Sequence, residues 1–184
     1  VGTSSLRRKC QILKLRPDLE IIDLRGNVGT RLSKLDAGLY DAIILASAGL
    51  KRLGLTDRIR HTLDAQLSLP AVGQGALGLE CRNDDQRILD LIAFLQHDET
   101  SACVRAERAF NAYLEGGCQV PIAAFAQLQG DHLIIEGRVG EPTGQTLLIA
   151  KQEGQSINAE QLGVALAKDL LAQGAGELLK ALYQ

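Results

Sequence analysis

The chain has 184 residues and a formal net charge of −2, which fits one large domain or two small ones and does not favour nucleic-acid binding. Apolar residues make up 46% of it and aromatic residues only 3%, so the core must consist mainly of Leu, Ile, Val and Ala. No apolar run reaches membrane-spanning length and no secretory signal opens the chain. We therefore expect neither a membrane nor a nucleic-acid partner.

The sequence contains no methionine and starts at Val1, so we expect it to be a fragment of a longer protein. The cysteines form no C-x-x-C pair and no metal-ligand spacing; they are Cys10, Cys81, Cys103 and Cys118. A reducing cytoplasm is the simplest location for such a set, and no metal site is expected.

The first helix is predicted from residue 6 to about residue 16, with Leu6, Cys10 and Leu13 on its buried face. Pro17 disfavours helical geometry in the residue before it and so marks the end.

Hydroxyl residues and arginines are concentrated at the start of this helix. Thr3, Ser4 and Ser5 are typical of an N-cap, where free backbone N–H groups can hold an anion. Arg7 and Arg8 lie in the first turn, where the helix dipole disfavours each cation by a few tenths to about 1 kcal/mol. An anionic ligand would compensate. The alternative is a pair of solvated surface arginines, which composition alone favours.

Residues 1–69 read as α/β units that lack a first strand. Buried strands are predicted at 19–24 and 41–46, with a glycine-bearing loop and a helix between them. Arg25 and Arg31 flank that loop, and ligands in such sheets bind at the carboxyl ends of the strands. Arginine suits carboxylates because its planar fork can bind both oxygens. Neither nucleotide-binding glycine fingerprint is present.

Residues 70–97 follow as a hinge, then a strand at 76–81 and a helix capped by Asp84 and Asp85. The apolar side chains of this segment that we expect to point inward are Ile88, Leu89, Leu91, Ile92 and Leu95. No sheet within this chain is evident for the segment to join.

Residues 98–184 read as a self-contained α+β domain. A helix from 98 to about 114 precedes three alternating runs at 122–129, 132–139 and 145–151, which predict an antiparallel meander. Two further helices are predicted, from 158 or 159 to 171 and from 175 to 183.

Between the first helix of this domain and its sheet lies the loop 114–121, LEGGCQVP. The paired glycines allow a sharp turn and Pro121 prevents return to a helix, so Cys118 sits on a constrained loop. From the loop alone, a buried small hydrophobe and an exposed functional thiol remain open.

Four strings resemble the porphobilinogen deaminase family in its own order: GTSSLRR, LRGNVGTRLSKLD, LPAVGQGA and LEGGCQVP. The family joins porphobilinogen units head to tail into hydroxymethylbilane with loss of ammonia, in tetrapyrrole biosynthesis. The resemblance implies an incomplete α/β domain of the periplasmic-binding-protein type, then the small α+β domain. It also implies a transferase that is monomeric.

The resemblance assigns roles residue by residue. Cys118 would hold a dipyrromethane cofactor through a thioether. The arginines that would bind cofactor or substrate carboxylates are Arg7, Arg8, Arg25 and Arg31. The hydroxyl and backbone donors would be Thr3, Ser4 and Ser5, and Gln74 would lie between domains.

The family's catalytic aspartate lies in an N-terminal domain that has no match here, and Asp23, Asp36 and Asp41 do not correspond to it. The segment 76–96 resembles the part of the family's chain that returns to that domain. We therefore expect residues 1–184 alone to be inactive. Without the resemblance, a non-catalytic anion-binding module of periplasmic-receptor type would fit the arginine loops equally well.

Overall fold

The computed structural model describes residues 1–117 and 120–182. The C-terminal half contains a three-stranded antiparallel sheet in the order β1-β2-β3, formed by β1 (Ile122–Gln129), β2 (His132–Gly140) and β3 (Leu147–Gln155). This confirms the predicted meander, although the third strand ends four residues later than expected. Short turns join the strands, so β1 and β2 pair from Ile122 with Val139 to Gln129 with His132.

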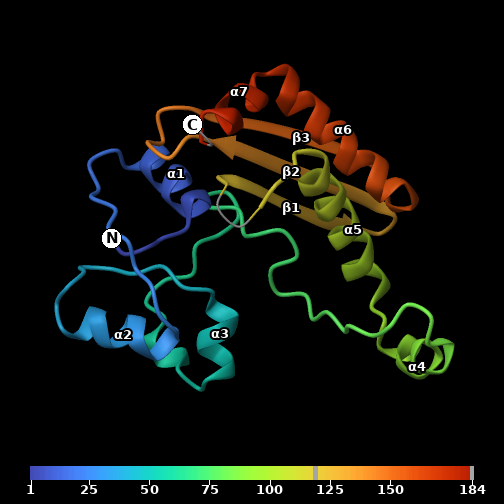
Figure 1. Ribbon diagram of the computed structural model, residues 1–184, viewed down its shortest axis with the longest axis horizontal. Coiled ribbons are helices and arrows are strands. Elements are labelled where there is room, and N and C mark those ends of the chain that lie inside the picture. The colour runs from blue at the N-terminus through green and yellow to red at the C-terminus, as the bar shows by residue number, and fades with distance from the viewer. Residues whose placement is uncertain (118–119, 183–184) are drawn as a thin grey trace.

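Two long helices, α5 (Asp98–Tyr113) and α6 (Ala159–Ala172), cover one face of this sheet, and α7 (Ala175–Lys180) follows α6 (Figure 1). The helices approach closely at Gly163, where an added Cβ would overlap the carbonyl oxygen of Ala106. Phe110 and Leu166 are fully buried between helices and sheet. This core is built largely of aliphatic side chains, as the composition requires.

The N-terminal half contains α1 (Leu6–Leu15), α2 (Val28–Asp36), α3 (Ser47–Arg52) and the single 3₁₀ turn η1 (Thr56–Arg58). The predicted strands at 19–24 and 41–46 are reduced to single parallel bridges, at Ile22 and Ile43. Both bridges are made with Gly2, which lies between the two segments. An added Cβ on Gly2 would lie 2.8 Å from the Tyr40 ring, so a larger residue would separate these segments.

The segment 70–97 contains α4 (Gln86–Ile92) and the short turn η2 (Ala93–Leu95), and α4 lies apart at the end of an extended stretch (Figure 1). The predicted strand at 76–81 is wrong, since no strand is assigned there. The predicted inward packing is also wrong for Leu91 and Leu95, which are 63% and 53% exposed. The physical reason is that no sheet of the described residues lies beside this helix to bury its apolar face.

The two halves meet where α1 packs against the end of β2 and the turn into β3. An added Cβ on Gly140 would lie 3.1 Å from the Cys10 sulfur, and one on Gly144 would lie 2.7 Å from the Leu13 carbonyl carbon. Lys14 donates from its ammonium group to the Gln145 carbonyl at 3.0 Å. The helix that carries the first arginine pair is therefore held directly by the C-terminal sheet.

Candidate functional site

Three extended segments of the N-terminal half each lead into a helix at the same end of their parallel bridges. Gly2 precedes α1, Ile22 precedes α2 and Ile43 precedes α3. Ser5 caps α1 by accepting from the Arg8 amide, and Asn27 caps α2 by accepting from the Thr30 amide. The carboxyl ends of the segments thus gather helix N-termini, which is the usual ligand position in open α/β sheets.

Arg7 and Arg8 point in two directions from the first turn of α1. Arg7 donates to the Leu69 carbonyl and Arg8 to the Ile44 carbonyl, each at 2.8 Å. Burial, together with the charge of Arg8, lowers the pKa of Arg7 to about 10. Both guanidinium groups remain charged at neutral pH, and both are held by backbone oxygen atoms.

Arg31, on α2, belongs to the same electrostatic cluster as Arg8. Burial lowers the pKa of Arg8, and the positive charge of Arg31 lowers it further. Arg31 itself donates to the Gly26 carbonyl at 2.7 Å, which fixes its side chain over the loop before α2. Arg25, at the start of that loop, is exposed.

Arg7, Arg8 and Arg31 therefore form a group of like charges around one end of the N-terminal half. Within residues 1–117 and 120–182, no ion pair includes these arginines or the exposed Arg25. Arg7, Arg8 and Arg31 are partly buried, and like charges without a carboxylate partner repel one another. A ligand with several carboxylates would relieve that repulsion, because its oxygens could accept charge-assisted hydrogen bonds.

The hydroxyl side chains at the helix start hold the local backbone. The Ser4 hydroxyl oxygen accepts from the Leu24 amide at 3.0 Å, and the Thr3 hydroxyl oxygen accepts from the Ser5 amide at 3.2 Å. Thr3 is buried, whereas Ser4 is exposed. These contacts tie the start of α1 to the segment that leads into α2, so the arginines of both helices are positioned together.

Gln74 lies elsewhere. Its side-chain oxygen accepts from the Ala71 amide at 3.2 Å, and the residue lines a cavity of about 290 Å³ between the 73–76 loop, α5 and β1. No hydrogen bond or ion pair among the described residues joins Gln74 to the arginine group. Cys118, the predicted cofactor anchor, lies outside the described residues.

Glu107 is a buried acidic residue that the sequence pattern did not predict as part of a site. It is 5% exposed in the wall of the same cavity and accepts from the Gly73 amide at 2.6 Å and from the Ala126 amide at 2.9 Å. Burial raises the pKa of its carboxyl group, although both amides act in the opposite direction. The sequence feature that could have identified Glu107 is its position as an acidic residue four positions after Cys103, on the side of α5 that also carries Ala106 and Phe110.

Two further properties bear on function. None of the helices in the described residues is both long enough and apolar enough to cross a membrane. Residues 1–117 and 120–182 contain no group of three His, Cys, Asp or Glu side chains that could hold a metal ion.

Two family models match the chain and together span most of it. Residues 1–90 match porphobilinogen deaminase, dipyromethane cofactor binding domain, and residues 101–172 match porphobilinogen deaminase, C-terminal domain. The first match covers every arginine of the cluster, and the second covers the loop and sheet that follow α5. The chain is a member of the porphobilinogen deaminase family.

Proposed function

We propose that this chain provides the arginine cluster and the cofactor domain of a hydroxymethylbilane synthase. Such an enzyme condenses four porphobilinogen molecules head to tail with release of ammonia. The observation that carries the proposal is the group formed by Arg7, Arg8 and Arg31, which lies at the helix starts and has no carboxylate partner among the described residues. Each pyrrole of the substrate carries an acetate and a propionate, so a growing chain supplies the missing negative charges.

The donor set fits a dipyrromethane, which carries four carboxylates. Arg8 and Arg31 act on one another electrostatically and would bind these groups, while Arg25 is exposed on the loop before α2. The cofactor would supply the pyrrole end to which the first substrate is joined. Cys118 would hold it through a carbon–sulfur bond, formed as the aminomethyl group of a pyrrole loses ammonia and the thiol loses its proton.

The remaining assignments follow from the family. The segment 70–97 would be a hinge and a return to the domain that carries the catalytic aspartate, which agrees with the exposed apolar side chains of Leu77 and Phe94. Residues 1–184 alone would bind the carboxylates but would not turn over substrate. We place the enzyme in the cytoplasm as a monomer.

Intact-mass measurement with peptide mapping tests this function. We expect the full-length protein to carry an adduct of two pyrrole units on Cys118. An Arg31→Ala variant should stall chain growth or cofactor assembly. An unmodified Cys118 in an active preparation, or an adduct on Cys10, Cys81 or Cys103 instead, would contradict the proposal. An unmodified Cys118 with no turnover would favour the anion-binding module.

A further inference from the structure

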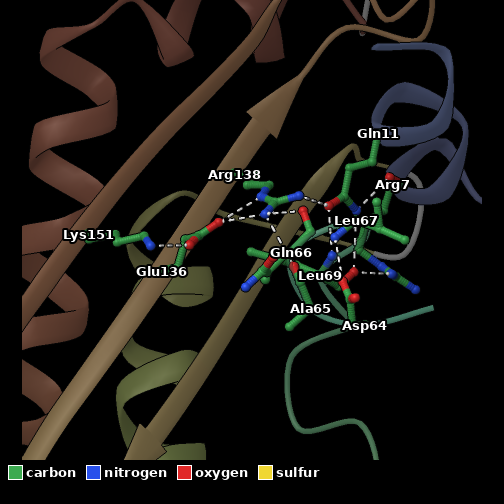
Figure 2. Close-up of polar contacts among 10 residues, drawn as sticks. All are labelled: Arg7, Gln11, Asp64, Ala65, Gln66, Leu67, Leu69, Glu136, Arg138 and Lys151. Carbon is green, nitrogen blue, oxygen red and sulfur yellow. Dashed lines mark hydrogen bonds and ion pairs between the residues drawn. The ribbon is translucent and has the colours of Figure 1, made fainter. Parts of the chain in front are cut away.

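Arg138 of β2 is 7% exposed and lies at the contact between the two halves of the molecule. Its guanidinium group donates to the Glu136 carboxylate at 2.8 Å, to the Gln11 side-chain oxygen at 3.1 Å, and to two backbone carbonyls. These carbonyls belong to Ala65 and Gln66, at 3.2 Å and 3.0 Å. Figure 2 shows the guanidinium between Glu136 on one side and the 64–69 segment with Gln11 on the other.

Gln11 links Arg138 to the arginine cluster through hydrogen bonds. It is 1% exposed, and its side-chain oxygen accepts both from Arg138 and from the Leu69 amide, the latter at 2.8 Å. Its side-chain nitrogen donates to the Arg7 carbonyl at 3.0 Å and to the Leu69 carbonyl at 3.3 Å. The Leu69 carbonyl is also the acceptor that holds the Arg7 guanidinium. One continuous set of hydrogen bonds therefore runs from β2 to Arg7 (Figure 2).

We propose that Arg138 is a positioning residue for Arg7. By fixing Gln11 and the 65–69 backbone, it holds the Leu69 carbonyl that orients the Arg7 guanidinium, and so aligns the arginine cluster with the domain that carries Cys118. This role rests on the proposed function. The planar fork of arginine is required, because a lysine ammonium cannot reach the Glu136 carboxylate, Gln11 and two carbonyls at once. The second cation on Glu136, Lys151 at 2.9 Å, is 65% exposed and belongs to β3, so it cannot replace that fork.

Hydrogen exchange of the Leu69 amide tests the positioning step directly. In the Arg138→Lys variant we expect this amide to exchange at least about tenfold faster, while amides in α5 and α6 keep their wild-type rates. Lys151→Met is the matched control, since it removes the other cation from Glu136 and leaves the fork in place. Unchanged protection of Leu69 in Arg138→Lys would overturn the positioning role, whatever any ligand does.

The step from Leu69 to Arg7 is tested by binding of a synthetic dipyrromethane with two acetate and two propionate groups. We expect Arg138→Lys to weaken binding about tenfold in the wild-type background, and much less in an Arg7→Lys background, because residues in one network are coupled. In an Arg8→Lys background the tenfold effect should persist. Equal effects in both backgrounds would overturn the specific link to Arg7.

The positioning role of Arg138 and the proposed function can be disproved independently. If the wild-type chain did not bind the dipyrromethane at all, the proposed function would be contradicted, while the exchange of Leu69 would still decide whether Arg138 positions that backbone.

Discussion

The side-chain oxygen of Gln11 on α1 accepts a hydrogen bond from Arg138 on β2 at 3.1 Å, although 127 residues separate the two in sequence. Both side chains are buried, so this contact lies inside the junction of the two halves rather than on its surface. With the close approach of Gly144 to Leu13, it fixes α1 to the C-terminal sheet. The helix that carries Arg7 and Arg8 in its first turn therefore contacts both halves.

Replacement of Arg138 by Met should destabilise the protein by about 2–4 kcal/mol. The aliphatic part would be kept, but Gln11, Ala65 and Gln66 would lose a charged donor in a buried setting. Urea unfolding would measure this loss. Arg16→Met is the matched control, because its ion pair with Asp18 is 62% exposed on both sides and should be worth less than about 1 kcal/mol. Equal losses of unfolding free energy in the two variants would show that the buried hydrogen bonds of Arg138 stabilise the protein no more than the exposed ion pair of Arg16 does.

A methyl group at Gly163 should be strongly destabilising. The added Cβ would overlap the Ala106 carbonyl oxygen and lie 2.9 Å from the Phe110 nitrogen, so α5 and α6 would have to separate. We expect Gly163→Ala to cost about 3 kcal/mol or more. Gly176→Ala, in α7, meets its nearest atom at 3.5 Å and should be neutral or stabilising, because alanine is the better helix former. Thermal unfolding of both variants would decide, and similar melting temperatures would contradict the packing.

Acid should weaken the protein partly through Glu136. Burial works to raise the pKa of this carboxyl group, but hydrogen bonds from Lys151 and Arg138 and their charges outweigh it and lower the pKa. A pKa that is lower in the folded state than in the unfolded state gives stability that is present above about pH 4.5 and is lost as the pH falls further. Glu136→Gln should therefore flatten the fall of unfolding free energy below about pH 4.5. If the unfolding free energy of this variant fell as steeply as that of the wild type, other carboxylates would be responsible for the acid sensitivity.

The Cys10 thiol should be unreactive in the folded protein. It is 1% exposed and donates to the Arg7 carbonyl at 3.3 Å, and burial raises its pKa to about 11. The thiolate is the reactive form, so iodoacetamide at pH 8 should modify Cys81, which is partly exposed, well before Cys10. Peptide mapping after a short exposure would show the order. Fast labelling of Cys10 would mean that α1 leaves the sheet readily.

Much of the local structure could be predicted from the sequence, because capping and strand signals are local. The limits of α1 follow from Ser5 and Pro17, and the meander follows from alternation interrupted by turn residues. The resemblance to a family, which its matching models confirm, supplied the list of arginines that the fold then brings to the carboxyl ends of parallel segments.

The rest depended on distant partners that no local pattern reveals. The apolar run at 76–81 has the composition of a strand, but no neighbouring strand among the described residues pairs with it. Arg138 lies within an alternating strand and would be read as a solvated position, whereas its two backbone carbonyl acceptors belong to residues more than seventy positions away. Glu107 interrupts the apolar side of α5 for the same kind of reason, since its donors are amides of Gly73 and Ala126.

Calorimetric titration with the four-carboxylate dipyrromethane tests most directly whether the arginine cluster binds the carboxylates of a pyrrole chain. The variants to compare are Arg8→Gln and Arg31→Gln, with Arg82→Gln as a control of equal charge whose side chain is 80% exposed. Loss of one charge-assisted contact should weaken binding by at least about thirtyfold. We predict that loss for Arg8→Gln and Arg31→Gln and near wild-type affinity for Arg82→Gln; equal affinities for all of these proteins would contradict the account.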